Sequence, residues 1–473
     1  MASFDDKHAA DIAVSDVHSD SPETKLMTPE GEEYLLQRHG TLDLDPMPRP
    51  TPDDPLNWPT WYKNLQIMQM AFMGFLATFM AAGISPAYED MAERYGMTVH
   101  EQLYLTSAMI LAFGIFPLFW VPVMQCYGRK WFLVIPSFCC FVLNLGAGFA
   151  KTYGQQMATR VLVAIFISMG TAAGGGLVRD LCFLKERAFK NGWWLMAFIL
   201  GTPAGPFFCG FIQYHCGTDW IYWVFAIMNF VQFLMWLPMK ETLRTPAPFS
   251  VKVFWAPFKQ AANINVLMAV IAALITFAYN NVCLVVLKPI LMAAFHLNSQ
   301  LLGLNYLSLI IGLVIGELLA GRVSDWWMQY CIRKRGQKVI VDRLWQGYIG
   351  FIVCIVGLFV WGAFLDQAGS TWNVRPLVGD GIAAAGNNIV ATVLTSFAID
   401  ANPTHALDVA LFLNLVRLTW SFLAPFYLPD MFERLKYLGL AGLMNGLVLV
   451  FGAGCTAIAH WLGRHKAVAV EKV

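Results

Sequence analysis

The sequence predicts an all-α polytopic membrane protein with twelve transmembrane helices in two pseudo-symmetric six-helix bundles. Three observations lead to this fold: an apolar composition, twelve long stretches with few charges, and a charged segment midway. Hydrophobic residues make up 57% of the 473 residues and charged residues only 13%, about half the usual share in a globular domain. A soluble chain of this length could not cover so much apolar surface with so few charges. The composition therefore argues against a soluble enzyme.

The twelve spans are predicted from the absence of charge. A transmembrane helix needs roughly 20 mostly apolar residues, because a charge at the bilayer centre is costly. Nine windows carry no charge: 64–88, 102–128, 131–150, 191–218, 220–239, 260–287, 344–365, 381–399 and 437–463. Three more become spans when one charge each is tolerated: 152–178 with Arg160, 289–321 with Glu317, and 409–429 with Arg417.

Lys and Arg in the connecting loops predict the orientation, because cytoplasmic loops carry an excess of them. With a cytoplasmic N-terminus, the inner loops after helices 2, 4, 6 and 8 hold sixteen Lys and Arg residues. The outer loops hold six, which are Arg94, Lys151, Lys288, Arg375, Arg434 and Lys436. We therefore expect both termini to be cytoplasmic.

The chain divides into five parts. Residues 1–57 hold thirteen acidic against four basic residues, without periodicity, so we expect a disordered acidic cytoplasmic tail. No basic and apolar leader opens this tail, so the first span should also direct targeting. An N-terminal bundle (58–239), a cytoplasmic central loop (240–259), a C-terminal bundle (260–463) and a cytoplasmic C-terminal tail (464–473) follow. Two six-helix halves with weak internal symmetry favour a rocking-bundle transporter with a central site.

Three segments carry a resemblance to a known family. They are DPLNWPTWYK (Asp54–Lys63), QLYLTSAMILAFGIFPLFWVP (Gln102–Pro122) and RVLVAIFISMGTAAGGGLVRDLCFLKERAFKNG (Arg160–Gly192). They resemble the lead-in to helix 1, helix 2, and helix 4 with its following loop in the major facilitator superfamily. The resemblance is to the fungal drug:proton antiporter branch with twelve helices, and it runs from about Asp54 to the end of helix 12.

The most specific segment is GTPAGPFFCGF (Gly201–Phe211) in helix 5. It is similar to the antiporter signature GxxxGPxxGG of that family, with Cys209 in place of the first closing glycine. Small residues let two helices approach closely, and a proline bends a helix. The resemblance implies a role in alternating access and export for the matching residues, whereas ordinary tight helix packing is the alternative. The matching residues are Gly201, Gly205, Pro206 and Gly210.

The loop after helix 2 departs from the family pattern. Arg129 is retained, but Gln125 stands where the family has an acidic residue. The corresponding loop of the second half keeps Asp325. We expect Arg129 and Asp325 to lie at the inner gate. With Gln125 in place of the acidic residue, this gate should be weakened or built differently.

Charges inside the spans are candidates for proton coupling and gating. Arg160 stands where the family places a basic residue, so the resemblance implies a proton-coupling or substrate-facing role. The alternative is an arginine whose side chain reaches the membrane surface. Glu317 is costly when ionised in an apolar run, which makes it a candidate proton carrier. Its alternative is an ion pair with Arg322 or another basic group near the inner gate.

Arg417 needs a partner or a water-filled cavity. Asp400, Asp408 and Glu317 are the acidic candidates in the same half. We favour a gating pair with Asp400.

The polar residues that could line a substrate cavity are few. Of two adjacent asparagines on a helix, only one should face a cavity. The candidates are Gln69, Tyr104, Tyr279, Asn280, Asn388 and Asn414.

The chemistry expected of this chain is transport. The sequence has no phosphate-binding loop, no metal-ligand spacing and no nucleophile–base pair in a span. We therefore expect no enzymatic activity, no cofactor, no metal and no nucleic-acid partner. The partners expected are a small-molecule substrate, protons and the lipid bilayer, with the protein acting as a monomer.

The leading hypothesis is a proton-coupled antiporter that exports a lipophilic or amphiphilic molecule, such as a drug, toxin or secondary metabolite, by alternating access. The alternative is proton-coupled uptake of a small organic solute such as a polyamine, although few carboxylates lie in the spans. A non-transporting receptor on the same scaffold is a further class. The plasma membrane is the expected location, with a vacuolar membrane as the alternative.

Overall fold

The computed structural model describes residues 28–171, 173–244, 252–335, 340–368, 372–402 and 405–470. Within them, every regular element is a helix. The first six passes are α3 (Thr60–Ala82), α5 (Val99–Ile115) with α6 (Pro117–Tyr127), α7 (Lys130–Ala147), α8 (Tyr153–Ile167) with α9 (Ala173–Leu181), α10 (Leu184–Cys216) and α11 (Thr218–Trp236). A short helix, α4 (Tyr88–Tyr95), lies between the first two passes.

The second six passes contain two π-helical segments, η6 (Phe277–Val282) and η9 (Val448–Ala453). The seventh pass runs through η6, and the twelfth runs through η9. The helices of this half are α13 (Ile264–Thr276) and α14 (Cys283–Phe295), α15 (Ser299–Asn305) and α16 (Leu307–Arg335), α17 (Leu344–Gln367), α18 (Arg375–Asp400), α19 (Ala406–Leu447) and α20 (Gly454–Val470).

The count of twelve passes follows from helix length and shape. Among the described residues, nine helical segments are long and apolar enough to cross a membrane, or ten when α5 and α6, bent by 43°, count as one. The segment Ala406–Gly463 has 58 residues, or roughly 87 Å of helix, which is far longer than one bilayer needs. It turns at Lys436, where φ is 56°, and so supplies two passes. The nineteen-residue α11 is long enough to cross a membrane but less apolar than these segments, and it is counted as the twelfth pass.

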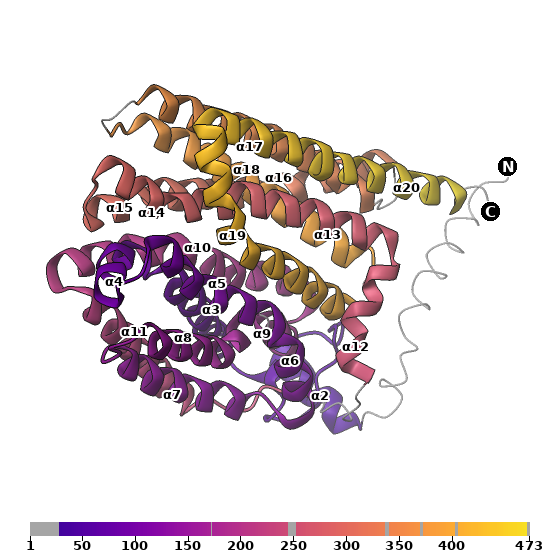
Figure 1. Cartoon of the computed structure of the whole chain (residues 1–473). Helices are drawn as coiled ribbons and strands as arrows, with labels where there is room; N and C mark the ends of the chain where they lie inside the picture. Colours follow the sequence, from indigo (N-terminus) through magenta and orange to yellow (C-terminus); the bar gives the residue numbers. More distant parts are fainter. Residues whose placement is uncertain are drawn as a thin grey trace.

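The passes form two bundles that lie side by side (Figure 1). Helices α3 to α11 form one bundle and α13 to α20 form the other, with α10 and α19 near the boundary. The end of the molecule that carries α4 and α15 is called the α4 end below. The opposite end carries α2 (Pro29–His39) and α12 (Lys252–Lys259) and is called the α2 end.

The outward faces of the bundles are apolar, as a membrane requires. On α7, large exposed hydrophobic residues recur every three or four positions, which is the spacing of one helical face. A second such face runs along α17. Outward-facing apolar side chains are stable when the surrounding solvent is the hydrocarbon of a bilayer. The two faces consist of Trp131, Ile135, Phe138, Val142 and Leu145 on α7, and of Trp345, Ile349, Ile352, Val356 and Phe359 on α17.

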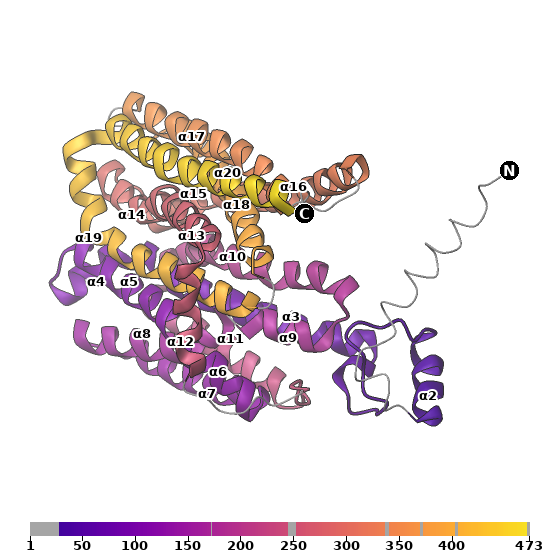
Figure 2. The same ribbon diagram turned by 90° about the vertical axis from the view of Figure 1, so that its right-hand side faces the viewer.

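Part of the stretch expected to be a disordered tail is folded. From Thr28 onward it contains α2 and a 3₁₀ turn at Pro55–Asn57, beyond the end of the bundle in Figure 2. Leu35 and Leu56 are fully buried, and Asp54 forms an ion pair with Arg244 at 3.0 Å. Acidic composition alone did not reveal these few anchoring contacts. Residues 1–27 lie outside the described part of the chain.

Helix α10 packs tightly on α3 through the glycines of its motif. An added Cβ atom at Gly201 would lie 2.4 Å from the carbonyl oxygen of Phe75, and one at Gly205 would lie 2.3 Å from that of Phe79. The hydroxyl of Thr78 on α3 donates a hydrogen bond of 2.7 Å to the carbonyl of Phe198 on α10. Backbone-to-backbone contact of this kind requires glycine.

We predict that Gly205→Ala lowers the thermal unfolding temperature of the purified protein, because the new methyl group overlaps backbone that cannot move aside. The cost should be about 1–3 kcal/mol, as in other overpacked interiors. Gly192→Ala on the same helix is the matched control, because no atom lies near its added Cβ, and alanine favours the helix. Equal unfolding temperatures for the two variants would contradict this packing.

Candidate functional site: a cavity between the two halves

A cavity of about 130 Å³ lies between the two bundles. Its walls come from α3, α4, α5 and α10 in the first half, and from η6, α14, α16, α18 and α19 in the second. This volume is below the ~300 Å³ of a typical ligand pocket. A drug-sized occupant therefore requires the two halves to move apart.

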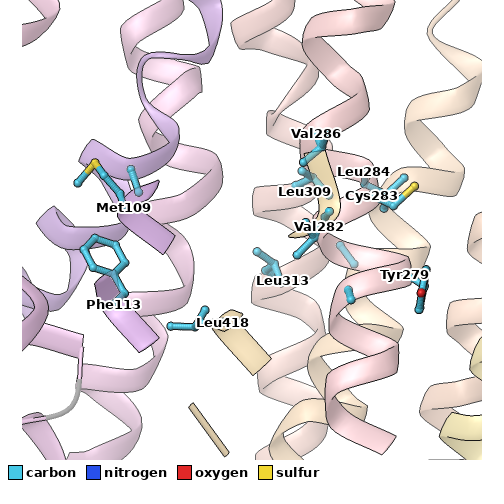
Figure 3. Packing of buried hydrophobic residues seen from close by; sticks show 14 of the residues in the cluster. Met109, Phe113, Tyr279, Val282, Cys283, Leu284, Val286, Leu309, Leu313 and Leu418 are labelled. Carbon is cyan, nitrogen blue, oxygen red and sulfur yellow. The ribbon is translucent and has the colours of Figure 1, made fainter. Parts of the chain in front are cut away.

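The cavity wall is mostly apolar. Figure 3 shows Phe113 of α5 facing Val282 and Leu313 of the second half, with Leu418 of α19 below them. The polar groups in the wall are hydroxyl and amide side chains and one arginine, Arg417. The hydroxyls belong to Thr78, Ser85, Tyr88, Thr106, Ser107, Thr202 and Ser421, and the amides to Asn281, Asn387 and Asn388.

The two halves contact one another at the α4 end. His100 of α5 donates a hydrogen bond of 2.8 Å to the carbonyl of Pro425 on α19. Next to it, the rings of Tyr104 and Phe426 stack with centroids 4.6 Å apart. Ser85 and Tyr306 share a hydrogen bond of 3.4 Å across the same boundary.

The last glycine of the α10 motif, Gly210, also lies at the contact between the two halves. An added Cβ at Gly210 would lie 2.6 Å from the carbonyl oxygen of Ser299 and 2.9 Å from the Cα of Gly303. Gly303 in turn lies against the carbonyl of Pro206. The motif therefore forms two interfaces, one with α3 inside the first half and one with α15 across the halves.

A buried ion pair lies beside the cavity in the second half. The Nζ atom of Lys288 on α14 lies 2.6 Å from Oδ2 of Asp380 on α18 and donates at 2.8 Å to the carbonyl of Asn305. The hydroxyl of Ser308 also donates to Asp380. Lys288 lies 5.1 Å from the ring centroid of Tyr306, a favourable cation–π distance.

Sequence reasoning missed this pair. It assigned Lys288 to an outer loop, and both residues stand at the edges of uncharged windows. Lys288 is 5% exposed and Asp380 is 0% exposed, so both lie inside the bundle. The spans were predicted from uncharged stretches of sequence, so a charged residue that enters the membrane with its partner was necessarily left outside them. The available signal was the window 381–399, which is slightly shorter than the roughly 20 residues of a span.

Arg160 is fully enclosed rather than directed to the membrane surface. It donates hydrogen bonds of 2.7 and 2.9 Å to the carbonyls of Met80 and Ala81, in the last turn of α3. These carbonyls lack partners inside the helix and carry the negative end of its dipole. Arg160 therefore fixes the end of α3, and it does not line the cavity.

Arg417 lines the cavity, but its expected ion pair with Asp400 is wrong. Asp400 ends α18 and lies 3.6 Å from Arg343. Arg417 lies three turns into α19, over the ring of Phe277 at 4.7 Å. A single long hydrogen bond of 3.4 Å joins it to Asn414.

Glu317 lies behind the cavity wall. Asn388 and Thr392 of α18 donate hydrogen bonds of 2.9 and 3.1 Å to its carboxylate. Among the interactions described for Glu317, none is with a cation. Its polar partners are neutral, and one of them, Asn388, also faces the cavity.

Arg129 is held within the first half. It is buried and lies 2.6 Å from Asp180 at the end of α9. Glu241 accepts hydrogen bonds of 2.9 Å from the backbone N–H groups of Arg129 and Lys130. Asp180 and Glu241 thus bind the segment after helix 2, in which Gln125 replaces the acidic residue usual in the family. The side chain of Asp325 lies outside the described part of the structure.

Of the six residues expected to line the cavity, Asn388 lines it and five lie elsewhere. The expectation that only one of two adjacent asparagines faces a cavity is wrong for Asn387 and Asn388, because both line it. Gln69 donates to the carbonyl of Met235 inside the first half. Tyr104 stacks on Phe426, Tyr279 packs on Tyr427, and Asn414 donates to the carbonyl of Phe113. Asn280 is fully buried, and its neighbour Asn281 faces the cavity instead.

The comparisons with known proteins identify the family. The family model of the Major Facilitator Superfamily matches residues 70–425. The chain belongs to the major facilitator superfamily. This transporter is a multi-pass integral membrane protein, as its family implies, and it is not an enzyme.

Two curated relatives of this transporter come from fungi. It is 27% identical over 442 residues to the efflux pump vrtL of Penicillium aethiopicum, covering 87% of each chain. It is 23% identical over 394 residues to the MFS-type transporter hepF of Aspergillus oryzae, covering 75% of this chain and 80% of hepF.

A solved structure supports the fold. It is a bacterial homologue of the human lysosomal transporter Spinster, in an inward-facing and unoccupied conformation. The two chains superpose with a TM-score of 0.60 at 15% identity, covering 86% of this transporter and 98% of that chain.

We predict that Lys288→Gln and Asp380→Asn each lower the unfolding temperature, whereas the double variant loses less than the sum. Removing one partner leaves the other charge buried and unpaired, at a cost of about 3–5 kcal/mol. Thermal unfolding of the four proteins in one detergent forms the double-mutant cycle. Arg375→Gln, at the exposed start of α18, is the control. Additive losses would show that the pair carries no coupling energy.

Proposed function

We propose that this transporter exports an amphiphilic small molecule in exchange for protons, by alternating access. The observation that carries the proposal is a largely apolar cavity between the halves with a carboxyl group, Glu317, directly behind its wall. A fungal relative named as an efflux pump supports export.

The proposed orientation places both termini in the cytoplasm, at the α2 end. The described loops at the α2 end are rich in Lys and Arg, and such loops lie on the cytoplasmic side of membrane proteins. In this orientation, the contacts of His100, Tyr104 and Ser85 close the cavity on the outer side. The plasma membrane is the proposed location, since export from a cell requires it.

Glu317 is proposed as the proton carrier. A carboxylate inside a membrane helix needs a counter-charge, and the described partners of Glu317 are the neutral Asn388 and Thr392. We infer that a proton neutralises the carboxylate of Glu317 in place of a basic side chain. Because Asn388 contacts both Glu317 and the cavity, a bound substrate can change the surroundings of this carboxyl group.

Uptake of a polyamine is the less favoured function. A polycation requires several carboxylates in its site. The described residues that line the cavity include neither Asp nor Glu.

Flux in sealed proteoliposomes tests the proposal. Amphiphiles of each charge and spermidine would be loaded in turn, and a pH gradient would be imposed across the membrane. Exit of an amphiphile against the direction of proton flow is the expected result. Movement of substrate and protons in the same direction would overturn antiport.

We predict that Glu317→Gln reduces gradient-driven flux to that of liposomes without protein, while substrate-for-substrate exchange continues. The amide retains an oxygen that accepts from Asn388 but cannot carry a proton. The comparison of driven flux with exchange separates coupling from folding. Glu433→Gln, on an exposed part of α19, is the matched control. Driven flux retained in Glu317→Gln would assign the proton to another group.

A further inference from the structure

Among the described residues, the charge in the cavity wall is a single arginine. Every other described residue that lines the cavity is apolar or carries a neutral hydroxyl or amide group, so Arg417 gives the described wall a positive charge. A positive group in a mostly apolar enclosure attracts an anion, because a low dielectric strengthens the attraction.

The guanidinium of Arg417 is poorly satisfied. It has five N–H donors, and its described hydrogen bond is the one to Asn414, at 3.4 Å. Its Nε atom is buried without a hydrogen-bond partner, as are those of Arg129 and Arg160, but those two arginines have short bonds from their terminal nitrogens. No carboxylate lies within 4.0 Å among the described ion pairs, and the remaining contact is the face of Phe277.

The acidic residues that could have paired with Arg417 have other partners. Asp400 contacts Arg343, and Asp408 contacts His405. Glu317 accepts from Asn388 and Thr392. The protein therefore holds a cation at the cavity without supplying its counter-ion.

Three other cations that the structure describes as buried in the bundles are compensated. Arg160 donates to two backbone carbonyls in the last turn of α3. Arg129 pairs with Asp180, and Lys288 pairs with Asp380. Because an uncompensated charge inside a membrane protein is costly, the exception at the cavity points to a ligand.

We propose that the substrate is an amphiphilic organic anion whose acidic group binds Arg417 while its apolar body fills the cavity. The planar fork of guanidinium donors matches a carboxylate best. The apolar part of the ligand would contact Phe277 and Phe113, which face the space beside Arg417. This assignment deepens the proposed export function and rests on it. It disfavours both lipophilic cations and polyamines.

Binding of three ligands with one common ring system tests the assignment. The probes are the anion 1-naphthaleneacetate, its neutral amide 1-naphthaleneacetamide, and the cation 2-(1-naphthyl)ethylammonium. Decanoate is a second anion with an aliphatic body. Affinities would be measured by equilibrium dialysis against the full-length protein in nanodiscs, with empty nanodiscs subtracted. The proteins are wild type, Arg417→Gln, Arg417→Lys and the control Arg434→Gln, whose side chain is exposed on the same helix.

We predict that wild type binds at least one anion about tenfold to hundredfold more tightly than the neutral amide, the range expected for charge-assisted hydrogen bonds. Arg417→Gln should lose this preference and leave amide binding unchanged. Arg417→Lys should keep the preference, and Arg434→Gln should match wild type. Because no carboxylate is left unpaired, Arg417→Gln should unfold at or above the wild-type temperature. Equal binding of amide and anion to wild type, no binding of either anion, or an anion preference retained in Arg417→Gln would each overturn the proposal.

The same proteins in proteoliposomes separate this inference from the proposed function. Anion binding that depends on Arg417 without proton-driven flux would uphold the anion site and overturn proton antiport. Proton-driven export of the amide or the ammonium compound, unaffected by Arg417→Gln, would uphold antiport and overturn the anion site.

Discussion

The constraint that shapes this molecule is the cost of a charge in hydrocarbon. Each ionised group inside the bundles must find compensation within the protein or its ligand. The chain uses three solutions: a paired acid for Lys288, backbone carbonyls for Arg160, and, for Arg417, the face of Phe277 and a position in the cavity wall. The first two fix helices relative to one another. The third leaves a guanidinium at the surface of the cavity, which is the arrangement expected of a binding group.

Close helix contact complements these charges. The glycines of α10 bring its backbone against α3 on one side and against α15 on the other. One contact lies within a half and the other crosses between the halves, so in the proposed cycle α10 would move with the first bundle and meet the second only when the α4 end closes. The cavity lies along the same helix, at Phe198 and Thr202. In that cycle, α10 would couple the position of the boundary to the cavity.

The fold could be predicted from the sequence because lipid excludes unpaired charges, and gaps between charges therefore mark spans. The same reasoning failed at Lys288 and Asp380, whose mutual attraction lets them enter the bundle. It also failed to select the cavity residues. In the π-helical η6, the wider turn changes which side chain faces inward, and Asn281 rather than Asn280 reaches the cavity. The α10 motif could be found because its glycines contact backbone and tolerate no substitute, whereas apolar cavity walls resemble any other helix packing.

Tyr306 takes part in both the buried ion pair and the contact between the halves. Its ring lies over the ammonium group of Lys288, and its hydroxyl shares a hydrogen bond with Ser85 of the opposite half. In the proposed alternating-access cycle, opening the α4 end would break the second contact, while a hydrogen bond of 3.2 Å from the same hydroxyl to the carbonyl of Val285 keeps the ring in the second half. Coupling between the contact and the ion pair is reciprocal: whatever free energy closure adds to the ion pair, the ion pair adds to closure. Closure of the α4 end is thus linked through one aromatic ring to a buried ion pair beside the cavity.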